Sequence, residues 1–264
     1  MLAGALWTAT IPLAIAVIGT RQLGLFVLMH DGAHALLHRD RRINDWVANW
    51  LCSFTLTAYR PHHLQHHRYV QQSEDPDLVL SAPFPITRAS FARKAVRDLT
   101  GQTFVKQRFG HYVDRLRKRA PDDSALTSFI DELKKDRRFL LGNALGYAIF
   151  AAAGHAWVWL VLWLLPMATW LPLVSRIRNI AEHALIRQNE ADPLRQARTT
   201  HANWVERALV APYWVNHHAE HHMFTQVACW NLPIAHRLLA RQQATRQMET
   251  ERGYLSLLAR ACAG

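Results

Sequence analysis

The sequence predicts an all-α integral membrane protein in which apolar runs flank a basic polar region. Residues 2–20 and 139–175 contain no charged side chain. Between them, residues 60–138 carry 16 of the 31 lysines and arginines. A bilayer core of roughly 30 Å needs about 20 apolar residues in a helix. This block pattern therefore predicts membrane spans joined by polar segments, all within one domain over residues 1–264.

The composition excludes several other classes of protein. Half of the 264 residues are hydrophobic, and Lys+Arg exceed Asp+Glu by 31 − 20 = 11. Such a chain can bury a large core, so a disordered, collagen-like or coiled-coil protein is excluded. Cys52, Cys229 and Cys262 lack metal-site spacing, which excludes a disulfide scaffold and a cysteine zinc finger. The basic residues alternate with apolar runs, which favours a membrane protein with no nucleic-acid partner.

The first span is predicted at about residues 4–29, although Arg21 interrupts its apolar run. The alternative is a helix that breaks near Gly19 and then restarts. A secretory signal peptide fits less well because the basic segment that begins such peptides is missing. Residues 43–59 are too short and too polar for a span, so we expect an interfacial helix there.

The run at 139–175 is too long for one span, since a helix of that length would reach about 55 Å. We expect a helical hairpin with arms at about 139–153 and 156–178, which turns at Gly154-His155. Pro166 and Pro172 should kink the second arm, as membrane helices tolerate.

The orientation follows from the loops. Basic loops stay in the cytoplasm, so residues 60–138 should be cytoplasmic, and a hairpin that starts there returns there. Residues 179–264 should then be cytoplasmic as well. With His30 at the cytoplasmic end of the first span, every histidine cluster falls on one side of the membrane, which we expect to be a bacterial inner membrane.

Histidine is the unusual residue, with 16 copies that gather in a few short groups. Spacings of three and four residues place side chains on one face of a helix. Neutral imidazole suits zinc, iron, copper and nickel. The alternative, a set of surface histidines on polar loops, explains a lone histidine better than it explains repeated H-x-x-H-H groups. The clusters are His30-x-x-x-His34, His63-x-x-His66-His67 and His218-x-x-His221-His222, with Asn179-x-x-x-His183 between the last two.

The number of candidate imidazoles indicates two metal ions. A structural zinc ion takes four ligands, and these clusters offer more than twice as many. Carboxylates beside metal-binding histidines commonly accept the other ring N–H and so fix the ring orientation. Asp31, Glu182 and Glu220 are placed for that role, with ordinary solvated carboxylates as the alternative.

These clusters resemble the three histidine boxes of the membrane fatty acid desaturase superfamily. The segment from Arg178 to His183 resembles the additional ligand region of that family. The runs Glu74-Asp75-Pro76-Asp77 and Arg198-Thr199-Thr200 are similar to bacterial members. Members usually have two spans before the first box, and here there is room for one. The resemblance covers about residues 19–236 and is specific for the superfamily, not for the substrate.

Carried over residue by residue, the resemblance implies two iron ions, with Asn179 holding a metal-bound water. His62 and His217 flank the boxes and are not counted. The implied iron ligands are His30, His34, His63, His66, His67, His183, His218, His221 and His222.

The resemblance also implies a reaction that uses O₂ to place a cis double bond in a fatty acyl lipid. A separate ferredoxin or cytochrome would supply electrons, because the sequence shows no dinucleotide, iron–sulfur or haem motif. The basic segment 88–119 could dock an acidic donor or lipid headgroups. Two alternatives stay open: a hydroxylase or ketolase of fatty acyl, sphingolipid or carotenoid substrates on the same scaffold, and a non-catalytic metal-binding membrane protein.

Overall fold

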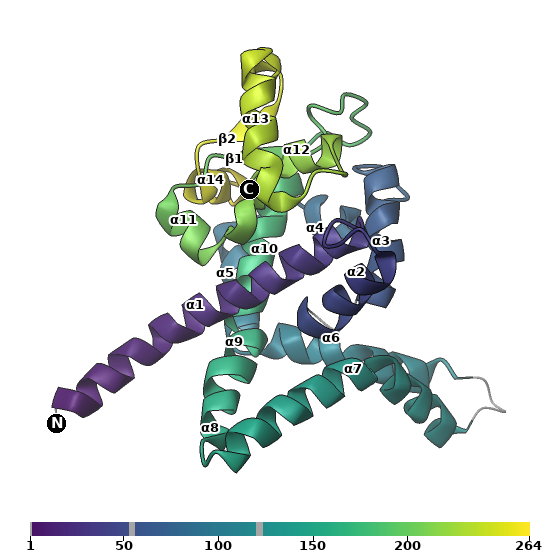
Figure 1. The fold of residues 1–264 in the computed structure, drawn as a ribbon. Coiled ribbons are helices and arrows are strands. Elements are labelled where there is room, and N and C mark those ends of the chain that lie inside the picture. Colours follow the sequence, from purple (N-terminus) through teal and green to yellow (C-terminus); the bar gives the residue numbers. More distant parts are fainter. Residues whose placement is uncertain (1, 53–55, 120–123) are drawn as a thin grey trace. The chain divides into compact units, whose positions relative to one another are not determined.

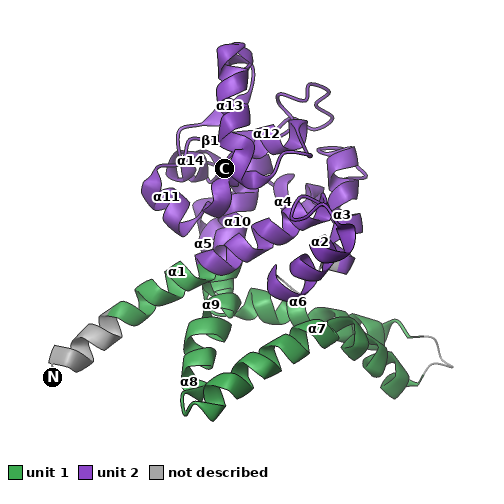
Figure 2. Ribbon diagram, in the orientation of Figure 1, with its two compact units in different colours: residues 1–19, 95–172 green, residues 20–94, 173–264 purple. Residues whose placement is uncertain are grey.

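The computed structural model describes residues 2–52, 56–119 and 124–264, and in this part of the chain almost all regular structure is helical (Figure 1). The only strands among these residues are β1 (Arg198–Thr200) and β2 (Glu249–Glu251), which pair in parallel with Arg198 opposite Glu249. The predicted all-α class is confirmed. The chain divides into two compact units (Figure 2): Met1–Gly19 with Ala95–Pro172, and Thr20–Lys94 with Leu173–Gly264.

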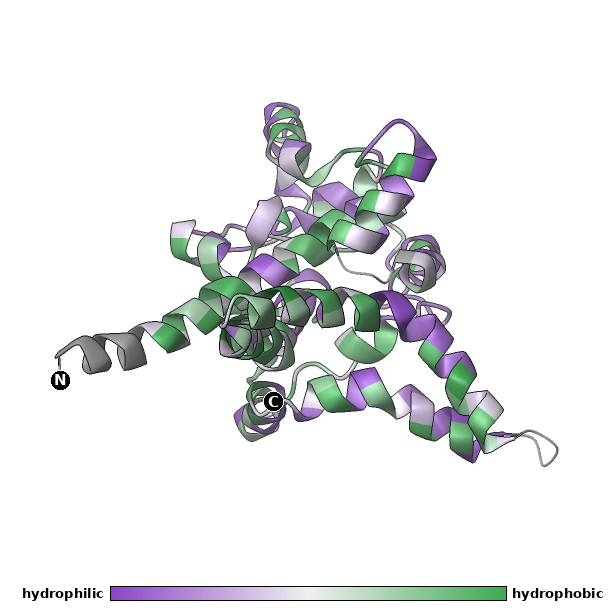
Figure 3. Ribbon diagram, turned by 60° about the horizontal axis from the view of Figure 1, so that its bottom comes forward, coloured by the Kyte–Doolittle hydropathy of each residue, from purple (hydrophilic) through white to green (hydrophobic). Residues whose placement is uncertain are grey.

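Among the described residues, two helices are long and apolar enough to cross a membrane by length and composition, Thr10–Ala33 and Ala156–His183. The first belongs to α1 (Leu2–Ala33), which is continuous, so the alternative of a break near Gly19 is wrong. Arg21 is accommodated because its guanidinium donates to the carbonyl of Ala208 at 2.7 Å. Figure 3 shows the described part of α1 coloured mostly as hydrophobic.

The first unit contains the predicted helical hairpin. Its arms meet at Gly154, which has a φ of +76° in the left-handed region that glycine adopts without strain. Gly146 lies against the ring of Trp159, where a Cβ would come within 2.1 Å of the indole. The helices of this unit, apart from the start of α1, are α6 (Gln102–Arg117), α7 (Ala125–Ala152), α8 (Ala156–Trp159) and α9 (Leu165–Ala168), with the π-turn η2 (Leu160–Leu164).

The second arm leaves regular α-helical form on both sides of Pro166, as the prolines predict. The π-turn η2 precedes that proline, and Thr169 has non-helical angles (φ −122°, ψ −70°) before α10 (Trp170–His183) begins. The predicted span at 139–153 forms the last part of α7, whose first half is charged. Its membrane crossing stays a prediction, as does the interfacial role of residues 43–59.

The second unit packs helices around a buried core that includes Val27, Ile180, Val215 and Leu257. In this unit Trp46 and Leu51 are exposed. Residues 53–55, which are part of the predicted interfacial helix at 43–59, lie outside the described chain. The helices are α2 (Arg41–Val47), α3 (Leu56–Tyr69), α4 (Leu78–Ser81), α11 (Trp204–Leu209), α12 (His218–Met223), α13 (Leu232–Arg241) and α14 (Tyr254–Ala261), with the π-turn η1 (Ala48–Cys52) and the 3₁₀ turns η3 (Pro212–Trp214), η4 (Cys229–Asn231) and η5 (Ala244–Arg246). Helix α5 (Arg88–Leu99) and helix α10 each have residues in both units.

Candidate metal centre

Eight of the nine histidines that the sequence singles out lie on the helices α1, α3, α10 and α12, and His34 directly follows the end of α1. His30 lies in the last turn of α1, His183 is the last residue of α10, and the H-x-x-H-H groups lie on α3 and α12. Spacings of three and four residues turn each helix's histidines toward one side. The structure brings all nine together within the second unit.

One set, which we call the five-histidine group, joins α1, α3 and α12. Their Nε2 atoms approach closely: His34 lies 2.8 Å from His63, and His67 lies 3.0 Å from both His63 and His221. One potential ligand atom from each member lies within 4.8 Å of those of the others. The members are His30, His34, His63, His67 and His221.

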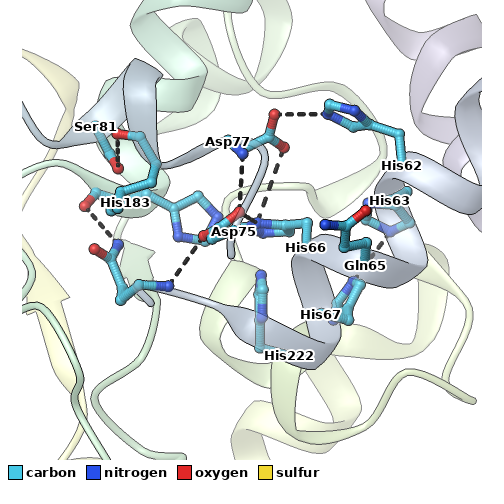
Figure 4. A network of polar contacts seen from close by, with 12 residues as sticks. His62, His63, Gln65, His66, His67, Asp75, Asp77, Ser81, His183 and His222 are labelled. Carbon is cyan, nitrogen blue, oxygen red and sulfur yellow. Dashed lines mark hydrogen bonds and ion pairs between the residues drawn. The ribbon is translucent and has the colours of Figure 1, made fainter. Parts of the chain in front are cut away.

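The other set, the four-histidine group, joins α3, α10 and α12. The Nε2 atom of His218 lies 2.9 Å from that of His183 and 3.1 Å from that of His222. Figure 4 shows the side chain of His66 among those of His183 and His222. The members are His66, His183, His218 and His222.

Both groups fit metal ions. Metal–imidazole bonds of about 2.1 Å, the length known for zinc, place ligands at right angles around an octahedral ion about 3 Å apart, which is close to the Nε2 separations of 2.8–3.1 Å. His30 is buried, and neither of its ring nitrogens has a hydrogen-bond partner. A buried polar atom without a partner is costly, and an ion inside the five-histidine group would satisfy one nitrogen of His30.

Burial also keeps six of these imidazoles neutral. It lowers the pKa of His34 to about 4 and that of His67 to about 2, and it holds the pKa of His63, His218, His221 and His222 well below the usual value. A neutral imidazole has the lone pair that a metal needs. At neutral pH these six residues therefore offer nitrogen donors without competing protons.

Carboxylates lie beside several of the rings, and one of them forms a hydrogen bond. His66 Nδ1 is hydrogen-bonded to Asp75 at 2.8 Å (Figure 4), and His218 Nδ1 lies 3.5 Å from Glu182. Asp31 lies 3.6 Å from His30 Nδ1 and accepts a hydrogen bond from the backbone N–H of Cys229. Asp31 and Glu182 thus lie where the sequence placed them. Glu220 does not contact the nine histidines in this way and instead accepts hydrogen bonds from Thr199 and His236.

Two arginines anchor the helix ends that carry histidines. Arg60 on α3 donates to the carbonyls of Gly32 at 2.8 Å and Ala33 at 3.1 Å, at the end of α1. Arg198 is fully buried and donates to the carbonyls of Ala181 and Ala184, at the end of α10. Helix ends leave carbonyls unsatisfied and carry partial negative charge. Arg60 therefore fixes the position of His34 relative to α3, and Arg198 fixes the position of His183 relative to β1.

The comparison with known proteins agrees with this geometry. Residues 5–251 match the profile of the family described as fatty acid desaturase. The chain belongs to the fatty acid desaturase family. Membership supports an oxidoreductase of the desaturase type that uses a metal centre.

Two curated desaturases are similar to the chain at low identity. The dihydrorhizobitoxine desaturase of Bradyrhizobium elkanii is 24% identical over 243 residues, which cover 86% of this chain and 67% of that protein. The chloroplastic omega-6 fatty acid desaturase of Brassica napus is 23% identical over 251 residues, which cover 90% of this chain and 55% of that protein. The chain thus spans about two thirds of the length of the first relative and little more than half of the second.

In this desaturase-family chain, three residues that the sequence analysis considered lie outside the two histidine groups. Asn179 is half-buried on α10, one turn before His183, and its water-holding role stays a prediction. His62, which the sequence analysis treats as a flanking residue, lies outside both groups, and its Nε2 atom lies 2.9 Å from Asp77 Oδ1. His217 also lies outside both groups.

Sequence reasoning missed the role of Asp75 and the two arginines. Asp75 and Arg198 nevertheless lie in the two runs that are similar to bacterial members, Glu74-Asp75-Pro76-Asp77 and Arg198-Thr199-Thr200. The hydrogen bond of Asp75 to His66 depends on the turn that follows α3, where Gln71 has a φ of +61°. Tyr59, whose ring stacks on that of His63 at a centroid distance of 5.0 Å, gave no signal in the sequence.

Proposed function

We propose that the chain is an oxygen-dependent di-iron membrane oxidoreductase that introduces a cis double bond into a fatty acyl chain. The observation that carries the proposal is the convergence of nine imidazoles into a five-histidine and a four-histidine group. Nine nitrogen donors in two groups suit two ions, and imidazole suits iron. When bound, such a pair of ions supplies the O₂ activation that removal of hydrogen from an unactivated C–H bond requires.

The protein's own residues would bind and orient the ions. The ligands are the nine histidines of the two groups, with Asn179 positioned to hydrogen-bond a water on one ion. Asp75 fixes the ring of His66 through a hydrogen bond at Nδ1, and Glu182 lies 3.5 Å from His218 Nδ1. Most of the nine rings are buried, which keeps bulk water away from the site.

The setting we propose is the bacterial inner membrane, with the histidine groups on the cytoplasmic side. Two apolar helices, Thr10–Ala33 and Ala156–His183, support membrane insertion. The excess of basic residues in 60–138 supports the orientation. A separate ferredoxin or cytochrome would bring electrons, and the basic segment 88–119 offers it a docking surface.

Product analysis tests the proposed reaction. The chain is expressed in a host of defined lipid composition, and lipids and small polar metabolites are analysed by mass spectrometry, since one relative is named for a fatty acid and the other for dihydrorhizobitoxine. We expect an acyl product that has lost two hydrogen atoms, absent with His66→Ala and retained with His155→Ala at the exposed hairpin turn. A product that has gained an oxygen atom would contradict desaturation in favour of hydroxylation.

A further inference from the structure

A third cluster of potential metal ligands includes residues within and next to the third histidine box. His217 directly precedes α12, Glu220 lies within it, and His236 lies on α13. One nitrogen or oxygen atom from each of the three lies within 4.8 Å of the others. None of the three belongs to the five-histidine or the four-histidine group, so the proposed reaction leaves this cluster without a role.

Glu220 is the centre of the cluster. It is fully buried, and its two carboxylate oxygens have different partners. Oε2 accepts a hydrogen bond from Thr199 Oγ1, which fixes the carboxylate plane. Oε1 faces both imidazoles: it accepts from His236 Nδ1 and lies 3.6 Å from His217 Nδ1. Three donor atoms of the types that zinc prefers therefore lie within 4.8 Å of one another.

His217 supplies an independent observation that points to a ligand at this cluster. The residue is only 9% exposed, and its Nδ1 atom, which faces Glu220, has no hydrogen-bond partner. Leaving such an atom buried and unsatisfied costs about 1–3 kcal/mol. A cation between the carboxylate and this nitrogen would satisfy the imidazole lone pair.

We propose that His217, Glu220 and His236 form a third metal site, which takes a divalent ion of the zinc type. In a tetrahedral zinc site with bonds of about 2.1 Å, ligand atoms stand about 3.4 Å apart, close to the 3.6 Å between His217 Nδ1 and Glu220 Oε1. The hydrogen bond between His236 and Glu220 gives way to two metal bonds, and water takes the fourth position. His236 is partly exposed, which gives the ion a path to the site.

A bound ion would tie α13 to the helix that carries His218, His221 and His222. Its effect would therefore be structural: it would hold the third box in place without contacting the nine histidines. The site differs from the two histidine groups in its ligands, with one carboxylate and two imidazoles in place of imidazoles alone.

Counting metals in matched variants tests this site. The full-length protein, purified with its resident metals, is equilibrated with excess zinc and desalted, and zinc and iron are measured by mass spectrometry. His236→Gln removes one ligand but keeps an amide that can donate to Glu220, so the fold is preserved. His155→Ala, at the exposed hairpin turn, is the control for loss of a surface histidine.

We expect the wild-type protein and His155→Ala to hold about one more zinc per chain than His236→Gln, with equal iron in all three. Zinc should raise the melting temperature of the wild type and leave that of His236→Gln unchanged, because an ion that binds only the folded state stabilises it. Equal zinc in the wild type and His236→Gln, or zinc uptake matched by loss of iron, would overturn the site. If His236→Gln also loses iron, the zinc measurement is repeated with His217→Gln, which removes the other imidazole beside Glu220. This variant should also hold about one zinc fewer than the wild type. Absence of iron with the zinc difference intact would count against the di-iron proposal alone.

Discussion

Asp75 shows how one side chain outside the histidine set can control the centre. One carboxylate oxygen accepts from His66 Nδ1 and from the backbone N–H of Asp77, and the other accepts from the N–H of Gln71. Burial raises the pKa of Asp75, but these hydrogen bonds more than offset that effect and leave it below the usual value. The residue is therefore an ionised carboxylate that holds the Nε2 atom of His66 toward the four-histidine group.

Asp75→Asn should weaken metal binding by the four-histidine group about 10- to 100-fold, the usual effect of losing a partner behind a ligand. The amide has one acceptor where the carboxylate serves three donors, so His66 loses its fixed orientation. The measurement is competition for the metal with a chelator of known affinity. Glu74→Gln, at the neighbouring exposed carboxylate, is the control, and equal affinities in the two variants would remove Asp75 from the account.

Asn179→Ala tests the water-holding role. Asn179 lies one turn before His183 and so shares its helix face. An amide is a poor iron ligand but hydrogen-bonds a metal-bound water well. We expect turnover to fall strongly while iron content falls only in part. Normal turnover with two irons per chain would contradict the water-holding role of Asn179 and leave the nine-histidine site unchanged.

At the scale of elements, the hairpin of the first unit depends on one close contact. Gly146 on α7 faces the ring of Trp159 on α8, and a Cβ there would lie 2.1 Å from the indole. Trp159 also lies beside Phe150, with ring centroids 5.7 Å apart. The glycine thus allows two helices of large side chains to approach each other.

Gly146→Ala should lower the melting temperature, because overpacking costs about 1–3 kcal/mol. Gly110→Ala is the matched control, since Gly110 is also helical and nothing lies within 4 Å of its added Cβ. That variant should be neutral or more stable, since alanine favours a helix over glycine by about 1 kcal/mol. The measurement is thermal unfolding of both variants in detergent. Equal melting temperatures would contradict a close contact between Gly146 and Trp159.

The sequence predicted elements well where it contains charge-free runs or regularly spaced histidines. The charge-free runs predicted α1 and the hairpin, and Gly154 marked the turn because it has no side chain to obstruct a positive φ. The spacing of the boxes selected the nine histidines that the structure brings together. It could not show the caps by Arg60 and Arg198, because these link residues that are distant in the chain and depend on tertiary packing. Glu220 was misjudged for the same reason, since its partners Thr199 and His236 come from other elements.

At the scale of the whole molecule, the proposed orientation predicts which sites are open to the outside. Cys52, Cys229 and Cys262 are buried, so they give little background in thiol labelling. We expect a membrane-impermeant maleimide to label His155→Cys, at the hairpin turn, in intact cells. Gln65→Cys, on an exposed position beside His66, should react only after lysis. Labelling of Gln65→Cys in intact cells would reverse the orientation.

The number of irons per chain tests the central claim most directly. The account predicts two irons per chain in the purified wild-type protein, because five imidazoles and four imidazoles form two separate groups. His221→Ala should reduce the iron in the five-histidine group and His183→Ala that in the four-histidine group, each variant keeping about one iron. A protein with a single iron, with no iron after reconstitution, or with two irons retained in both variants would contradict the account.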